Sequence, residues 1–219
     1  MLSEFGLVLV HMINSKPITQ DDGAFLMFLD FSRSEASPTE VKEAIIKNID
    51  NINIYLIEPI LPGITVDRVH FPLLFLNERA VIFRESALKG WIVDVREKFG
   101  TGGEALLYHI GFNMGYEIYE SYSREDVRKY KRWTILCLML YTAGFAEKMR
   151  VNVSENSVNV KVWNNIECSM GRQSKKPYGQ LLRGIIGGFA TEYFDRKVKV
   201  IENRCIAIGD PYCEFLVYT

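Results

Sequence analysis

Two cysteines near the end of the sequence bracket a short turn, and this segment constrains the fold more than any other. Between Cys205 and Cys213 lies Ile-Ala-Ile-Gly-Asp-Pro-Tyr, in which the Gly209–Pro211 tripeptide is typical of a tight turn between strands. Cys168 lies upstream, and Glu202 supplies a carboxylate three residues before Cys205. Three thiolates and one carboxylate can form a closed tetrahedral zinc site, so these four residues are candidate metal ligands.

A regular hairpin would not bring these four side chains together. Residues three apart in a strand, such as Glu202 and Cys205, point to opposite faces of a sheet. Across a four-residue turn, Cys205 and Cys213 would also point to opposite faces. A metal site therefore requires a β-bulge or an irregular loop. The alternative is that the thiols are small buried apolar residues, which is how we interpret Cys137 in an apolar helix.

The composition is that of a globular protein. The 219 residues are 48% hydrophobic and the formal net charge is -1, which allows a substantial core and does not suggest direct binding to nucleic acid. Glu4 stands where a secretory signal would carry bases, and the longest nearly uncharged run, 133–146, is too short to span a bilayer. We therefore expect a cytoplasmic protein without a membrane span, with thiols that are reduced or bind a metal.

Residues 1–66 are predicted to form a small α+β unit. Pro38 occupies an early helix position, where its missing N–H is harmless. The expected elements are a strand, a second strand, a helix and a third strand: Phe5–Met12, Ala24–Phe31, 38–48 and Ile52–Glu58. Two prolines and a glycine within 59–63 then mark a boundary, so we assign residues 67–219 to a second domain.

The second domain alternates helical and strand patterns. Thr101 and Glu104 fit a capping box at the start of a helix that ends near Tyr122. The other expected elements are a strand, a helix, a hairpin, a helix and a final strand before the cysteine hairpin: Arg79–Arg84, 124–148, 151–162, 178–194 and 197–202. This order predicts an α+β fold with an antiparallel sheet packed against helices.

Two of these helices carry glycines four residues apart, on one helical face. The pairs are Gly111 with Gly115 and Gly184 with Gly188. A glycine inside a helix costs about 1 kcal/mol relative to alanine, so we expect packing to offset that cost. The pattern therefore predicts close approach of a helix to another helix or to the sheet.

Several large side chains of the second domain are candidates for a small-molecule pocket. His109 is the one histidine that we single out, although a lone histidine is more often structural than catalytic. The candidate ligand-binding residues are His109, Phe112, Trp133, Tyr141 and Trp163. The same residues can equally form plain core. No catalytic triad, carboxylate pair or dinucleotide fingerprint stands out, so the sequence leaves enzymatic activity open and favours a non-enzymatic protein.

The terminal motif resembles that of the 4-vinyl-reductase domain family. The resemblance covers roughly residues 80–219 and is most specific in Glu-x-x-Cys over 202–205 and Gly-Asp-Pro-x-Cys-x-Phe over 209–215. The glycine-containing segment from Gly100 to Gly115 supports it more weakly.

The resemblance implies a fold similar to that of subunits of a vesicle-tethering complex and of the phenol-sensing domains of transcription activators. It also implies homodimerisation through helices. In the sensors a zinc ion is held by three cysteines and a glutamate, which correspond here to Cys168, Cys205, Cys213 and Glu202. The sensors also carry ATPase and DNA-binding domains that this sequence does not contain, so we do not expect such an activator here.

Three functional hypotheses follow. The first is a cytoplasmic, zinc-containing homodimer that binds a small hydrophobic or aromatic molecule as a sensor or carrier. The second, implied by family members in bacteriochlorophyll biosynthesis, is a reductase or accessory factor acting on a tetrapyrrole vinyl group, which would need an external hydride source. The third is a dimerising interaction module without a ligand, which a solid core would favour.

Overall fold

The computed structural model describes residues 2–16, 24–58, 74–75, 78–124 and 127–219. The chain divides into two compact units, Met1–Val81 and Ile82–Thr219. The domain boundary predicted between residues 66 and 67 lies outside the described residues. Each unit has a hydrophobic core of its own, so each is described by itself.

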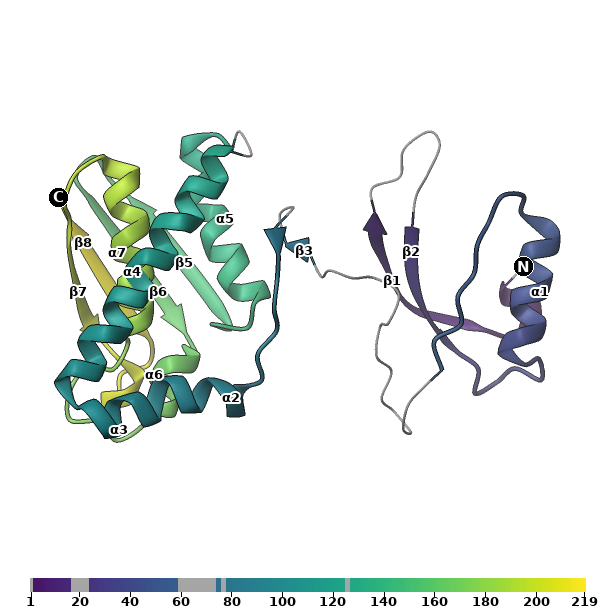
Figure 1. The fold of residues 1–219 in the computed structure, drawn as a ribbon, viewed down its shortest axis with the longest axis horizontal. Coiled ribbons are helices and arrows are strands. Elements are labelled where there is room, and N and C mark those ends of the chain that lie inside the picture. Colours follow the sequence, from purple (N-terminus) through teal and green to yellow (C-terminus); the bar gives the residue numbers. More distant parts are fainter. Residues whose placement is uncertain (1, 17–23, 59–73, 76–77, 125–126) are drawn as a thin grey trace. The chain divides into compact units, whose positions relative to one another are not determined.

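The first unit contains a β-hairpin and a helix (Figure 1). Ser37 caps the helix, since its hydroxyl accepts the Glu40 N–H while the Glu40 carboxylate accepts the Ser37 N–H. The buried core is formed by Leu7, Val41 and Ile45. The elements of this unit are η1 (Leu2–Phe5), β1 (Val8–Lys16), β2 (Ala24–Asp30), α1 (Pro38–Asn48) and the short pair β3 (Leu74–Phe75) and β4 (Glu78–Arg79).

Two strand predictions near the end of this unit are wrong or too long. The segment Ile52–Glu58 forms no regular strand. Its alternating residues Ile52 and Ile54 pack against the core instead, without a hydrogen-bonded neighbour strand among the described residues. The strand expected over Arg79–Arg84 is confined to Glu78–Arg79, because the chain soon enters a helix.

The second unit begins with a run of helices: α2 (Glu85–Lys89), the π-helical turn η2 (Gly90–Asp94), α3 (Val95–Phe99) and α4 (Thr101–Arg124). Gly100, at φ +55°, joins α3 to α4. The capping box expected from Thr101 and Glu104 gives way to other contacts. The Glu104 N–H donates to the Gly100 carbonyl, and the Glu104 carboxylate pairs with Lys176 Nζ at 2.8 Å.

The next helix, α5 (Lys129–Thr142), is shorter at both ends than the predicted 124–148. Gly144 adopts a left-handed conformation with φ +78° directly after it, which turns the chain out of the helix. Lys148 then pairs with Trp163 as the first residue of a strand. The apolar pattern of the region continues across this turn, so periodicity alone does not reveal it.

The sheet of the second unit has four strands in the order β5-β6-β8-β7, all antiparallel to their neighbours. The remaining elements are β5 (Lys148–Val153), β6 (Ser157–Trp163), α6 (Ile166–Met170), α7 (Gln180–Phe194), β7 (Lys199–Arg204), η3 (Ile206–Ile208) and β8 (Cys213–Tyr218). The predicted hairpin around residues 154–157 is confirmed, and so is the α+β fold with an antiparallel sheet packed against helices.

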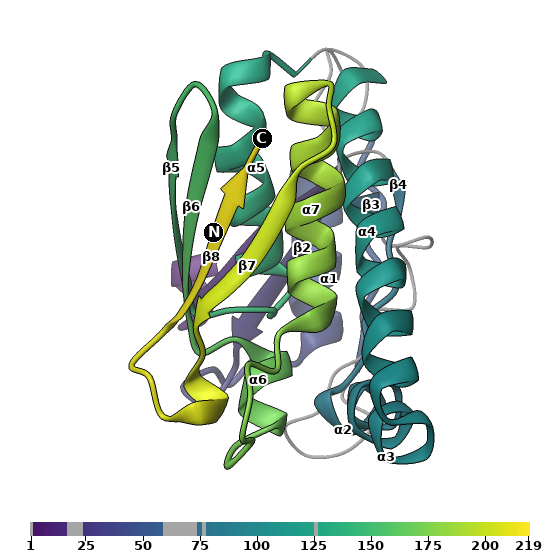
Figure 2. The same ribbon diagram turned by 90° about the vertical axis from the view of Figure 1, so that its left-hand side faces the viewer.

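The helices cover one face of this sheet, with α7 between the sheet and α4 (Figure 2). Inward-facing side chains of β6 and β8 pack on α5 and α7. This core includes Trp133, Leu140, Val160, Ile186, Phe189 and Phe215. None of the described helices is long and apolar enough to cross a membrane.

The glycine pairs lie at the contact between α4 and α7. A methyl group on Gly111 would collide with the Leu181 carbonyl oxygen, and one on Gly188 would collide with that of Phe112. The predicted close approach is therefore a helix–helix contact, in which backbone lies against backbone.

Candidate metal centre and neighbouring cavity

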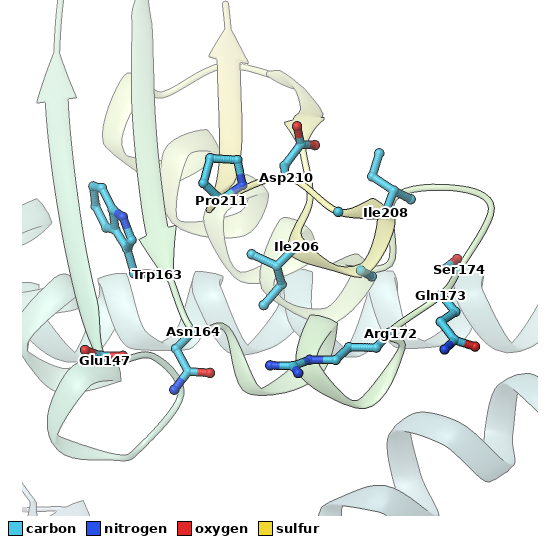
Figure 3. Close-up of a pocket in the computed structure, with 12 residues that line it drawn as sticks. Glu147, Trp163, Asn164, Arg172, Gln173, Ser174, Ile206, Ile208, Asp210 and Pro211 are labelled. Atoms are coloured by element: carbon cyan, nitrogen blue, oxygen red, sulfur yellow. The ribbon is translucent and has the colours of Figure 1, made fainter.

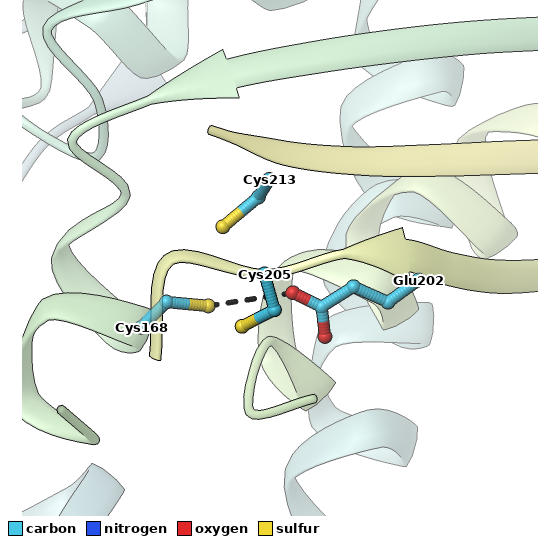
Figure 4. Close-up of side chains that lie close together, drawn as sticks. All are labelled: Cys168, Glu202, Cys205 and Cys213. Carbon is cyan, nitrogen blue, oxygen red and sulfur yellow. Dashed lines mark hydrogen bonds between the residues drawn. The ribbon is translucent and has the colours of Figure 1, made fainter. Parts of the chain in front are cut away.

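The four predicted metal ligands lie together in the second unit. The sulfur atoms of Cys168, Cys205 and Cys213 and a carboxylate oxygen of Glu202 all lie within 4.8 Å of one another. The three cysteines are fully buried and Glu202 is 8% exposed. Figure 4 shows the four side chains converging on one point, from α6, from β7, from the residue that precedes η3 and from the start of β8.

The hairpin formed by β7 and β8 is irregular in two places. These irregularities allow Glu202, Cys205 and Cys213 to point to the same side of the sheet, which a regular hairpin would not. Glu202 pairs with Phe215 and Arg204 pairs with Glu214, so β7 has one extra residue opposite β8. This bulge moves Cys205 to the side of the sheet that Glu202 faces. Beyond it the chain forms η3 instead of a simple turn, with Gly209 at φ +101°.

Backbone and amide groups around the cluster donate hydrogen bonds to it. The Asn165 amide lies 3.1 Å from Cys168 Sγ and 3.8 Å from Cys213 Sγ. The Tyr178 N–H donates to Cys205 Sγ at 3.4 Å, and the Gly179 N–H donates to Glu202 at 2.8 Å. Donors of this kind stabilise negative charge on sulfur and oxygen, which is the ionisation state that a metal requires.

The close packing of four acidic groups shifts the pKa values within the cluster. Burial, together with the Cys205 sulfur, raises the pKa of Glu202 to about 8. A hydrogen bond from Cys168 lowers the pKa of Cys205 to about 2, and the same contact raises the pKa of Cys168. Four acidic groups in one buried volume cannot all be charged unless a cation offsets them. The donor set, three sulfurs and one carboxylate, fits a tetrahedral zinc ion.

The fourth cysteine lies apart from this cluster. Cys137 is buried in α5 within the apolar part of the unit. Burial raises its pKa to about 11, as for an inert core thiol.

A buried ion pair lies next to the cluster. Glu167 precedes Cys168 and is 1% exposed, and its carboxylate pairs with Arg96 at 2.6 Å. The same carboxylate accepts the N–H groups of Leu181 and Leu182 in the first turn of α7. Burial raises the pKa of the Glu167 carboxyl, but Arg96 and these N–H donors favour its charged form. The pair ties α3, α6 and α7 together beside the cluster.

A surface cavity of about 670 Å³ lies beside the segments that follow Cys168 and Cys205. Residues after Cys205 form one wall and residues after Cys168 form another. The lining residues are Glu147, Trp163, Asn164, Arg172, Gln173, Ser174, Ile206, Ala207, Ile208, Gly209, Asp210 and Pro211 (Figure 3).

The five predicted ligand-binding residues lie in different places. Trp163, at the end of β6, lines the cavity. Trp133 is buried in the core, where its indole N–H has no hydrogen-bond partner among the described residues. His109 and Tyr141 lie on exposed parts of α4 and α5, and Phe112 is half-buried on α4 beside Tyr108. Their role as ligand contacts stays a prediction.

Four residues that matter for this region were not predicted from the sequence. Three of them, Asn165, Glu167 and Arg172, lie close to Cys168 in the sequence, and their polar side chains beside a candidate ligand were the only local signal. Arg96 could not be found this way, because it lies 71 residues from its partner Glu167.

Comparison with known proteins relates the second unit to one domain family and to one solved fold. The family model of the 4-vinyl-reductase domain matches residues 158–219. Two uncharacterized proteins of Methanocaldococcus jannaschii are 26% and 28% identical to this chain over 125 and 124 residues. These alignments cover 57% and 54% of this chain and 70% and 66% of the two relatives.

Among solved structures, the phenol-responsive sensory domain of the transcription activator PoxR, in its crystal structure with phenol, has a TM-score of 0.57 and 16% identity to this chain. That match covers 64% of this chain and 77% of the sensory domain. A vinyl-4-reductase family protein from Methanocaldococcus jannaschii gives a TM-score of 0.47 and 18% identity, over 63% and 82% of the two chains.

The likeness to the sensory domain shows a shared fold. The resemblance predicted from the terminal motif is thereby confirmed: residues 158–219 of this chain match the 4-vinyl-reductase domain family.

Proposed function

We propose that this protein is a zinc-stabilised domain that binds a small hydrophobic or aromatic molecule. The observation that carries the proposal is the buried cluster of Cys168, Glu202, Cys205 and Cys213, with ligand atoms within 4.8 Å of one another. Adjacent sulfurs around a tetrahedral zinc lie about 3.8 Å apart, so the cluster needs only small adjustments to bind the ion.

The zinc would be structural. Four protein ligands fill a tetrahedral shell, and a catalytic zinc keeps one position open for water or substrate. The ion would join the loop after Cys168 to the terminal hairpin, and these two segments form walls of the cavity. A zinc site needs reduced thiols, which fits a reducing compartment such as the cytoplasm.

The small-molecule part of the proposal is supported by the cavity and by the fold. Trp163 and Ile206 give the cavity aromatic and apolar surface, which suits a small aromatic compound. The PoxR sensory domain, which shares the fold, is solved with phenol. We therefore extend aromatic binding to this chain as a proposal.

We further propose that the domain forms a homodimer through α4. Leu106, Ile110 and Met114 follow one another at four-residue spacing on this helix, and each is at least 38% exposed. An apolar stripe of this kind on a helix typically packs against another surface. A second copy of the same helix would cover it symmetrically.

The test of the metal site is elemental analysis beside native mass spectrometry of the purified, untagged protein. We expect about one zinc ion per chain, and loss of that zinc in Cys205→Ser and in Cys213→Ser. Cys137→Ser is the matched control, since it removes a buried thiol away from the cluster, and it should keep the zinc. Native spectra also report dimer mass and any bound molecule.

Metal-free wild-type protein would overturn the zinc site. So would zinc retained in both Cys205→Ser and Cys213→Ser. Loss of zinc from Cys137→Ser as well would show that the metal is lost through general destabilisation, and would leave the assignment to these four ligands without support.

A further inference from the structure

The cavity beside the cluster has an aromatic wall and a cationic side chain. Trp163 lies on one side, Ile206 at the centre and Pro211 above it (Figure 3). Arg172 extends beneath Ile206 toward Asn164 in the same view. A flat apolar molecule in this cavity would contact Trp163 and Ile206 while its edge would face a guanidinium group.

Arg172 is available for a ligand. Within the part of the chain that the structure describes, its guanidinium has no hydrogen bond or ion pair to another side chain. Asn164 accepts a hydrogen bond from Ser169 through its amide oxygen, and its amide N–H groups have no acceptor among the described residues, so they can donate to a ligand. A planar guanidinium beside an amide donor suits a carboxylate.

The nearby negative charges do not cancel this cation. Asp210 accepts the Cys205 N–H at 2.8 Å and lies 3.9 Å from Arg204, which also lies 3.9 Å from Glu214, so the Asp210 charge is offset in part. Glu147 is the other carboxylate that lines the cavity. Three cations oppose the charge of Glu147: Arg172 and two residues of β5, Lys148 and Arg150. The charged group of Lys148 lies 5.3 Å from the Trp163 ring centre, and that of Arg150 lies 5.7 Å from it.

The backbone holds these groups in place at some cost. Asn164 has φ +51° and Gln173, which follows Arg172, has φ +73°. Residues other than glycine rarely adopt this conformation, and such residues concentrate at binding sites. Gln173 lies in the loop after α6, the helix that carries Cys168, and Asn164 lies in the connection that leads from β6 into α6.

We propose that the cavity selects small aromatic carboxylates over neutral aromatic compounds, with the ring against Trp163 and Ile206 and the carboxylate on Arg172. This inference rests on the proposed function, because it names the ligand class of the same cavity. Neither the match to the 4-vinyl-reductase domain nor the fold shared with the PoxR sensory domain assigns an anionic ligand.

The experiment is isothermal titration of the zinc-loaded full chain with two probes, phenol and 4-hydroxybenzoate, which differ only by a carboxylate. We expect 4-hydroxybenzoate to bind at least about fivefold more tightly than phenol, as for a charge-assisted pair at a partly exposed site. Arg172→Gln should bring the two affinities to within about twofold. Lys197→Gln, which removes an equal charge at an exposed residue outside the cavity lining, should keep the preference.

Trp163→Leu should weaken both probes, which shows that they bind in this cavity and not in the core around Trp133. Binding of phenol with equal or higher affinity than 4-hydroxybenzoate would overturn this inference and leave the proposed function standing. If Arg172→Gln still preferred 4-hydroxybenzoate over phenol as strongly as wild type, this inference would likewise be overturned and the proposed function would stand. Binding of neither probe at millimolar concentration would overturn aromatic binding by this cavity altogether, independently of the zinc content.

Discussion

At the scale of single residues, buried carboxylates organise the second unit. Glu202 and Glu167 both accept N–H groups at the start of α7, one through Gly179 and the other through Leu181 and Leu182. A helix N-terminus carries unpaired N–H groups and a partial positive charge, so carboxylates are favourable there. One of the two also belongs to the cluster, and the other pairs with Arg96. The start of α7 therefore links the candidate metal site to α3.

Glu167→Gln tests this link. The amide keeps the shape of the side chain but leaves the buried Arg96 guanidinium without its countercharge, so we expect a loss of about 3 kcal/mol in the free energy of unfolding. Glu104→Gln is the matched control: it removes the exposed pair with Lys176 and should cost less than about 1 kcal/mol. Urea unfolding followed by tryptophan fluorescence measures both, because Trp91, Trp133 and Trp163 all lie in the second unit. Equal losses would contradict the importance of the buried pair.

At the scale of elements, the contact between α4 and α7 depends on glycine. The backbones of the two helices approach so closely at Gly111 and Gly188 that no side chain fits between them. The sequence pattern of glycines four apart predicted a close contact but left its partner open, as either a helix or the sheet. The structure assigns the contact to the two helices because both glycine pairs face each other.

Gly111→Ala should destabilise the second unit by about 2 kcal/mol, because its methyl group would meet the Leu181 carbonyl and force α4 and α7 apart. Gly102→Ala lies in the same helix with open space around it, and it should stabilise the unit by up to about 1 kcal/mol through helix propensity. Thermal and urea unfolding of the two variants give the comparison. A Gly111→Ala protein as stable as wild type would show that α4 and α7 can move apart without a loss of stability, and would contradict this prediction.

At the scale of the whole molecule, the two units are separate in their cores. The first buries Leu7, Val41 and Ile45, whereas the second buries a larger cluster around Trp133 and Phe189. The metal-ligand cluster, the cavity and the residues that match the 4-vinyl-reductase domain model all lie within Ile82–Thr219. We therefore propose that metal and small-molecule binding are properties of the second unit.

A chain restricted to residues 82–219 should fold and bind zinc. We expect its unfolding transition, followed by tryptophan fluorescence, to lie within about 1 kcal/mol of that of the full chain, because a unit with its own core folds alone. Its zinc content, measured by elemental analysis, should also match that of the full chain. Failure of the shortened chain to fold, or a loss of zinc, would contradict the independence of the two units.

The sequence by itself determined the α+β class, the sheet hairpins, the glycine contact and the roles of Glu202, Cys205 and Cys213 as candidate ligands, because each depends on local periodicity, turn chemistry or a short motif. It also indicated that a bulge was needed if Glu202, Cys205 and Cys213 were to meet. Tertiary structure alone decided where the extra residue of that bulge falls, how Cys168 reaches the hairpin, and that Arg96 pairs with Glu167. It also left Ile52–Glu58 outside any strand. These outcomes depend on contacts between residues far apart in the chain, which no local pattern encodes.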